Sequence, residues 1–188
     1  LVEVGVGLIP AWCGTKEMVK RIITPAMQIP NADPLPPLQK AFEQLALAKT
    51  STSAMEARDM GFLRSVDRIV MDKARQLAEA KRTVLELLTE GYIPTPPQKL
   101  YAAGRDAKSA LHMAIYQLHQ GKFASDHDAK RARHLAHILC GGDVTAPTWL
   151  DEQHFLDLER DAILSLLGEQ KTLERIQHML TTGKPLRN

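Results

Sequence analysis

The sequence predicts a mainly α-helical protein with few short strands, and three observations support this. Apolar residues recur three and four positions apart through most of the chain after residue 35, which is the spacing of one face of a helix. Residues that cap helix N-termini precede several of these runs, and glycine follows several of them. After the opening segment, only residues 65–71 (SVDRIVM) show the alternating, β-branched pattern of a strand.

Three helices are expected in the first half of the chain. A proline-containing turn at residues 31–37 leads into the first, whose apolar face holds Leu38, Ala41, Phe42, Leu45 and Ala46. Ser53 and Glu56 have the spacing of a capping box and predict a short second helix. Asp72 caps a long third helix that ends at Gly91.

A proline-rich stretch, residues 92–98 (YIPTPPQ), separates the two halves. Its three prolines cannot continue a helix and form a stiff, extended linker, so we divide the chain into residues 1–97 and 98–188. Everything beyond the linker is expected to be helical. The pattern predicts four helices whose apolar stripes pack as a bundle, at residues 106–120, 125–139, 149–167 and 169–182.

Composition and charge disfavour several classes of function. The 188 residues carry a formal net charge of +2, so we expect no electrostatic attraction to nucleic acid or to an anionic membrane. No apolar run approaches the roughly 18 residues that span a bilayer. Cys13 and Cys140 lie far apart in sequence, which predicts free thiols in the reducing cytoplasm. His134 and His137 lie three residues apart without a third ligand nearby, so no metal site is expected.

The opening residues, LVEVGVGLIPAWCGT, contain the most informative motif. They show no initiator methionine, signal peptide or leading turn, so we expect the chain to be the C-terminal piece of a larger protein. An acidic residue, Glu3, is followed by Gly7, then by the pair Ile9-Pro10, and then by Gly14-Thr15. This order resembles the crotonase superfamily, which contains the enoyl-CoA hydratases and isomerases.

A second block of residues strengthens the resemblance. Residues 53–57 (SAMEA) lead to Gly61, and Asp67 and Ile69 then fit the strand that follows in that family. The long helix after Asp72 is similar to the helices that close the crotonase fold. The resemblance therefore implies that residues 1–97 are the C-terminal half of a crotonase-like α/β domain and that residues 98–188 are a helical extension.

The resemblance also implies a chemistry for the opening motif. Glu3 matches the family's acid–base carboxylate, which moves a proton during hydration or double-bond isomerisation of an enoyl thioester. The backbone N–H near Ala11 would help to hold water or the carbonyl oxygen. Ala11-Trp12-Cys13 stands where the family usually has a glycine cluster, so Trp12 either forms a wall of a reshaped acyl pocket or disables the site. A nucleophilic role for Cys13 is disfavoured, because no base lies near it in sequence.

The distal half resembles the tail of the fused β-oxidation proteins, in which a 3-hydroxyacyl-CoA dehydrogenase precedes a crotonase-type domain. The resemblance rests on residues 125–128 (SDHD), 141–143 (GGD), 158–160 (LER) and 183–188 (GKPLRN). It implies an acyl-CoA thioester as substrate, NAD bound only in the upstream dehydrogenase module, and that module as a partner. The family's second acid, its oxyanion segment and most of its CoA contacts come earlier in sequence, so we expect the chain alone to be inactive or nearly so.

The competing hypothesis is a non-enzymatic helical module. In that case residues beyond about Tyr101 dock a partner or build a homo-oligomer, and the opening motif is a vestige. The segment Gly5-Val6-Gly7 is not a nucleotide-binding loop, because no third glycine follows in register. The basic run at 130–133 (KRAR) is interpreted as a solvated helix face, with steering of the CoA phosphates as its functional alternative.

Overall fold

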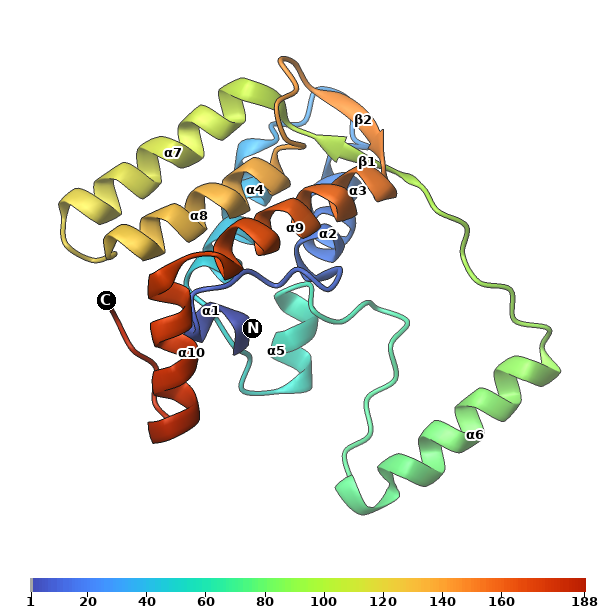
Figure 1. The fold of residues 1–188 in the computed structure, drawn as a ribbon. Helices are drawn as coiled ribbons and strands as arrows, with labels where there is room; N and C mark the ends of the chain where they lie inside the picture. Colours follow the sequence, from blue (N-terminus) through green and yellow to red (C-terminus); the bar gives the residue numbers. More distant parts are fainter. Residues whose placement is uncertain (1) are drawn as a thin grey trace.

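The computed structural model describes residues 2–188, which form a helical fold with one two-stranded sheet (Figure 1). The mainly α-helical fold class is thus confirmed. The elements before the linker are α1 (Val2–Gly5), α2 (Gly14–Met18), the π turn η1 (Val19–Ile23), α3 (Thr24–Ala26), α4 (Leu35–Ala46), α5 (Ala54–Asp59), the 3₁₀ turn η2 (Lys73–Arg75) and α6 (Gln76–Thr89). Those after it are β1 (Lys99–Ala102), α7 (Gly104–Gln120), α8 (Asp126–Leu139), β2 (Thr148–Asp151), α9 (Glu152–Leu167) and α10 (Gln170–Thr182).

The segments α2, η1 and α3 follow one another without a break and form one helical stretch over residues 14–26. It begins at Gly14. Its middle is a π turn that ends at Ile23, and Pro25 comes two residues later. A proline has no N–H to donate to the carbonyl four residues earlier, so the regular hydrogen-bond ladder cannot run through this point. Val19 and Ile23 are fully buried on this stretch.

One hydrophobic core draws on both sides of the linker. Its fully buried members include Ile9, Val19, Ile23, Leu38, Leu100, Leu135, Ile138 and Phe155. Helix α4 lies against α8, and α2 contacts both α8 and α9 (Figure 1). The predicted parts 1–97 and 98–188 therefore share a core.

The sheet corrects the prediction that everything beyond the linker is helical. Strands β1 and β2 pair antiparallel, with Lys99 opposite Asp151 and Tyr101 opposite Trp149. The Tyr101 and Trp149 rings meet edge to face with their centroids 5.5 Å apart. Because β2 takes residues 148–151, the helix predicted from residue 149 begins at Glu152 instead.

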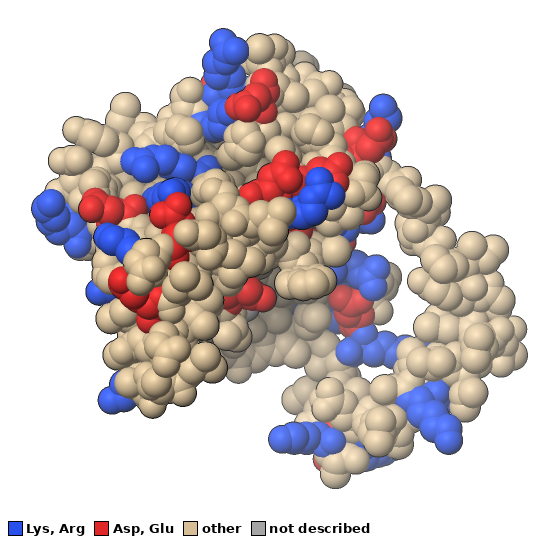
Figure 2. Space-filling model, viewed as in Figure 1, with Lys and Arg blue, Asp and Glu red and all other residues tan. Residues whose placement is uncertain are grey.

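Residues 64–98, which we call the arm, stand apart from the core (Figure 1). The strand predicted at residues 65–71 is wrong: this stretch is irregular, its side chains are exposed or half-buried, and it pairs with no neighbouring strand among the described residues. No residue of α6 is buried, not even its leucines: Leu77 is 83% exposed and Leu88 is 70% exposed. On the face shown in Figure 2, the linker part of the arm is uncharged, while acidic and basic side chains intermingle over the rest of the molecule.

Several helix ends follow the predicted capping chemistry. Ser125 Oγ accepts a hydrogen bond from the N–H of Asp128, and the Asp128 carboxylate accepts one from the N–H of Ser125, so this capping box is complete. Ser53 Oγ likewise accepts from the N–H of Glu56, but the Glu56 carboxylate turns to Thr52 instead of Ser53. No helix within residues 2–188 is long and apolar enough to cross a bilayer.

Candidate functional site

A cavity of about 450 Å³, which we call the α2 cavity, lies beside the N-terminus of α2. Its size falls in the range of roughly 300–1,000 Å³ typical of small-molecule sites. The wall combines apolar side chains with charged ones, among them Trp12, Met18, Phe62, Glu17, Arg21 and Lys49. Both cations of the wall are paired with carboxylates, Arg21 with Glu17 at 2.8 Å and Lys49 with Glu43 at 3.1 Å.

The loop that enters α2 is tightly folded. Both the N–H and the hydroxyl of Thr15 donate to the carbonyl oxygen of Pro10, at 2.9 and 3.1 Å. A Cβ on Gly14 would lie 2.8 Å from Cβ of Pro10, so the turn requires glycine there. Cys13 adopts a left-handed backbone conformation with φ of 66°, which is uncommon for a residue other than glycine.

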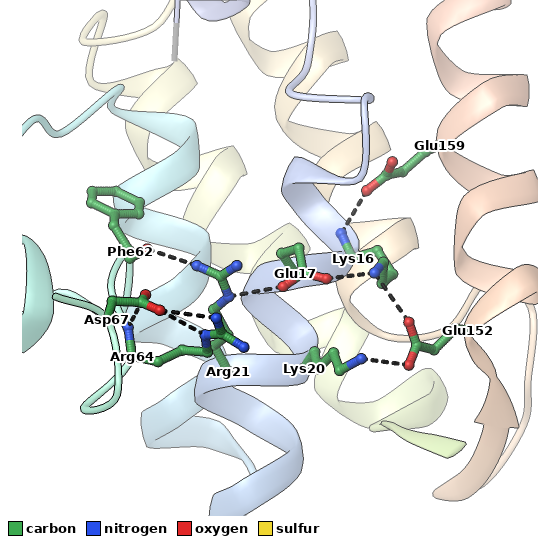
Figure 3. Close-up of polar contacts among 9 residues, drawn as sticks. All are labelled: Lys16, Glu17, Lys20, Arg21, Phe62, Arg64, Asp67, Glu152 and Glu159. Carbon is green, nitrogen blue, oxygen red and sulfur yellow. Dashed lines mark hydrogen bonds and ion pairs between the residues drawn. The ribbon is translucent and has the colours of Figure 1, made fainter. Parts of the chain in front are cut away.

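Glu159 of α9 closes the N-terminus of α2 from the core side (Figure 3). Its carboxylate accepts hydrogen bonds from the N–H of Cys13 at 3.0 Å and of Lys16 at 2.5 Å. The positive end of the helix dipole and these unsatisfied N–H groups favour a carboxylate there. Glu159 is nevertheless fully buried, and burial raises its pKa to about 7 against the lowering effect of these hydrogen bonds.

A chain of ion pairs fixes the next turn of the same helix to α9 (Figure 3). Lys16 Nζ contacts Glu17 at 2.5 Å and Glu152 at 3.1 Å, and Lys20 Nζ contacts Glu152 at 2.7 Å. Burial opposes ionisation of Glu152, but hydrogen bonds from Lys20, from the N–H of Gln98 and from Lys16 lower its pKa to about 2. The carboxylate is therefore ionised at every physiological pH, and the network holds the helix rigidly beside the cavity.

Arg21 connects this helix to the far wall of the cavity. Its Nε donates to Glu17 at 2.8 Å, and its Nη1 donates to the carbonyl oxygen of Phe62 at 2.6 Å. Arg64 and Asp67 form a further pair just beyond (Figure 3). The guanidinium thus positions the chain that leads away from α5.

The three predicted site residues, Glu3, Ala11 and Trp12, differ in burial and in whether they line the α2 cavity. Glu3 lies half-buried on α1, and Ala11 lies half-buried against the core. Trp12 is 89% exposed and lines the cavity. Of the three, only Trp12 lines this cavity.

Glu159 and Arg131 are buried charged residues that the sequence reasoning missed. Glu159 follows Phe155 by four positions and precedes Ala162 by three, so it occupies the apolar stripe of its helix, a signal that could have identified it. Arg131 is only 4% exposed, so the interpretation of residues 130–133 as a solvated face is wrong at that position. Arg133 is exposed, as that interpretation expects.

The histidines lie mostly in partly buried positions. Burial lowers the pKa of His134 and of His137. His127 is buried and its Nε2 lies 2.8 Å from the hydroxyl oxygen of Thr172. Within residues 2–188, no group of three or more His, Cys, Asp or Glu side chains is placed to hold a metal ion.

Comparison with known proteins gives one informative similarity. All 188 residues align at 40% identity with a protein of Bacillus subtilis (strain 168) named "Probable 3-hydroxyacyl-CoA dehydrogenase". The aligned region is 23% of that protein, so the chain spans about a quarter of its relative. No protein-family model matches the chain, and no solved structure matches it.

Proposed function

We propose that this chain is the acyl-CoA-handling segment of a longer 3-hydroxyacyl-CoA dehydrogenase polypeptide of β-oxidation. The observation that carries the proposal is the similarity over its full length to one segment of the Bacillus subtilis protein. The enzyme as a whole would act on acyl-CoA thioesters. Within it, this segment would contribute enoyl-CoA hydratase or isomerase chemistry. We place the protein in the cytoplasm, because Cys13 and Cys140 are both free thiols.

The described fold does not fit an NAD site. Dinucleotide-binding domains use a parallel sheet and a glycine-rich turn that leads from strand to helix. Residues 2–188 contain one antiparallel pair of four-residue strands, and Gly5 and Gly7 lie at the end of a short helix. We therefore assign NAD-linked oxidation to the remainder of the longer polypeptide, upstream of this segment.

Glu3 lies on α1 and outside the lining of the α2 cavity, so in this proposal it is the acid–base residue of a hydratase or isomerase site that upstream residues of the longer polypeptide complete. During hydration its carboxylate takes a proton from the water whose oxygen adds to Cβ of the enoyl thioester, and it returns a proton to Cα, so that H and OH are both added across the double bond. During isomerisation it carries one proton across the allylic system. The N–H near Ala11 helps to hold water or the thioester oxygen, and Trp12 forms a wall for the acyl chain. Lys49, whose ammonium group pairs with the exposed carboxylate of Glu43, is the cation of the cavity wall that would meet the phosphates of coenzyme A.

The substitution Glu3→Gln in the full-length polypeptide tests this proposal. We expect hydration of a 2-enoyl-CoA, followed by loss of the conjugated thioester absorbance, to fall by on the order of 10² or more, the scale of a lost acid–base group. NAD-linked oxidation of a 3-hydroxyacyl-CoA by the same preparation is expected to stay unchanged. Glu90→Gln, at an exposed position on the arm, is the matched control. Equal hydration rates in the wild type and in Glu3→Gln would contradict the proposal.

The second candidate function is a helical interaction module, and the exposed α6 supports it. This helix presents apolar side chains to solvent without burying any of them, and such faces mark interaction sites. A second copy of the chain is the partner we propose for this case. Reading the coding DNA upstream of Leu1 separates the candidates. A second acid about 20 residues before Glu3 and a dinucleotide-binding motif farther back favour the enzyme, whereas a start codon just before Leu1 favours the module.

A further inference from the structure

A second cavity, of about 250 Å³, borders α4, α7, α8 and the C-terminal segment. Its wall is mostly apolar, with Phe42, Ile115, Leu118 and Leu186 among the lining residues. Phe123, 78% exposed, stands at its edge. The cavity is smaller than a drug-sized site, so it suits a short aliphatic chain.

The guanidinium of Arg131 lies in this wall and lacks part of its hydrogen bonding. Arg131 is 4% exposed. Its Nη2 donates to the carbonyl oxygen of Ala46 at 2.9 Å, at the C-terminus of α4. Among residues 2–188, its Nε and Nη1 have no hydrogen-bond acceptor, and both atoms are buried. Buried guanidinium groups in folded proteins are normally paired or fully hydrogen-bonded, because an unpaired buried charge is strongly unfavourable.

The carboxylate nearest in sequence, that of Asp128, makes its hydrogen bonds with residues other than Arg131. Asp128 lies one turn earlier on α8, and its Oδ1 accepts from Nη1 of Arg175 at 2.8 Å. Its Oδ2 accepts from the N–H and the hydroxyl of Ser125, at 3.2 and 3.0 Å. Arg187 is a third arginine in the wall, so three cations face one carboxylate around the cavity. The surplus charge is positive.

Arg131 remains a cation despite its burial. Burial and the positive charge of Arg175 lower its pKa to about 10, which still leaves the guanidinium protonated at neutral pH. The cavity thus combines an apolar wall with a guanidinium cation whose Nε and Nη1 lack acceptors.

We propose that this cavity binds a short aliphatic carboxylate, with its head group at Arg131 and its hydrocarbon chain against Phe42, Ile115 and Leu118. A carboxylate supplies the anionic oxygen that a buried guanidinium requires. The apolar wall supplies the area that a hydrocarbon chain buries. The site shares no lining residue with the α2 cavity, and the inference does not depend on the proposed function.

Hexanoate is the probe, and isothermal titration calorimetry on the 188-residue chain is the measurement. We expect saturable binding of hexanoate, and no binding of hexanoamide, which has the same chain without the charge. Inorganic phosphate, which has charge without a chain, is expected not to bind. Equal affinity for phosphate would overturn the aliphatic part of the proposal, and absence of hexanoate binding would overturn all of it.

Two substitutions on α8 test whether Arg131 binds the carboxylate. Arg131→Met removes the guanidinium and keeps an apolar side chain, and we expect it to weaken hexanoate binding at least about tenfold. Arg133→Met, an exposed position two residues away, is the control and is expected to bind as the wild type does. A folded Arg131→Met protein that binds hexanoate normally would place the ligand elsewhere.

A measurement on the wild type covers the case in which Arg131→Met does not fold. The Nε–H signal of Arg131 in a ¹⁵N-correlated NMR spectrum is expected to shift as hexanoate is added and to follow the calorimetric saturation curve. A signal that stays fixed while hexanoate binds would exclude Arg131 as the head-group site.

Discussion

Oε2 of Glu159 accepts a hydrogen bond from the backbone N–H of Cys13 at 3.0 Å, across 146 residues of sequence. The other carboxylate oxygen accepts from the N–H of Lys16. One buried side chain of α9 therefore holds the loop that carries Trp12 and the first turn of the helix behind it. The position of the cavity wall depends on this contact, and so does part of the pH dependence of folding.

Glu159 makes the stability of the protein fall as pH rises through neutrality. Its pKa is about 7 in the folded protein, against the ordinary value of 4.5, so the folded state binds the proton more tightly than the unfolded state. This contribution is fully present below about pH 4.5 and is lost as pH rises through 7. It amounts to roughly 3–4 kcal/mol, at about 1.4 kcal/mol for each pKa unit.

The substitution Glu159→Gln removes this proton-binding group. We expect the free energy of unfolding of the wild type, measured by urea denaturation, to decrease between pH 5 and pH 7 relative to that of the variant. Glu90→Gln, at an exposed site, is expected to keep the wild-type slope. Parallel pH profiles for the wild type and Glu159→Gln would show that Glu159 does not titrate in this range.

Ser125→Ala removes the cap of α8 and one contact of Arg175. Ser125 Oγ accepts from the N–H of Asp128 and from Nη2 of Arg175. We expect the free energy of unfolding to fall by about 1–2 kcal/mol, the range for a lost N-cap. Ser109→Ala, on the exposed side of α7, should stay within about 0.5 kcal/mol of the wild type. Equal losses in both variants would mean that the capping box does not stabilise α8.

Gly141→Ala should destabilise the protein much more than Gly168→Ala. A Cβ at position 141 would lie 2.3 Å from Cβ of buried Ala102, and the backbone there has φ of +85°. Overpacking and backbone strain together predict a loss of about 3 kcal/mol, measured as a lower denaturation midpoint. Gly168 has ordinary helical backbone angles, and a Cβ there makes only normal contacts, so a comparable loss in Gly168→Ala would refute the explanation.

Leu88→Glu tests whether the arm pairs with a second copy of the chain. Leu88 is 70% exposed, so the free energy of unfolding should change by no more than about 0.5 kcal/mol. In sedimentation velocity we expect the wild type to self-associate and Leu88→Glu to be monomeric. Thr89→Glu adds the same charge one position around the helix and should keep the self-association. A wild-type chain that stays monomeric at all concentrations would remove α6 as a dimer surface.

Helices with strong end signals could be predicted from the sequence. Ser125 and Asp128 form the predicted capping box, and Gly183 ends α10 in a left-handed conformation, with φ of 68°. In both cases the decisive interaction lies within a few residues of sequence, where a pattern can report it.

Features that depend on distant partners could not be predicted. Strands β1 and β2 are four residues each, and their pairing joins residues about 50 apart, as with Lys99 and Asp151. Residues 65–71 show the reverse error, because an alternating pattern forms no strand without a neighbour to pair with. The fold class was therefore predictable, and the sheet was not.

The candidate site was predictable only in part. Trp12 lines the α2 cavity, and its role as a wall of an acyl pocket stays a prediction, whereas Arg21 and Lys49 carried no sequence signal. Glu159 contacts the site through backbone N–H groups, which every sequence contains. The role of Glu3 as an acid–base residue stays a prediction.

The arm also determines how the chain responds to cutting. Residues 64–98 bury no side chain, whereas the segments before and after them share one core. Proteolytic cleavage within the arm breaks the covalent connection and leaves that core intact. The two resulting polypeptides are complementing fragments: expressed separately, each would lack half of its interior, and together they would reassemble one folded unit without a peptide bond between them.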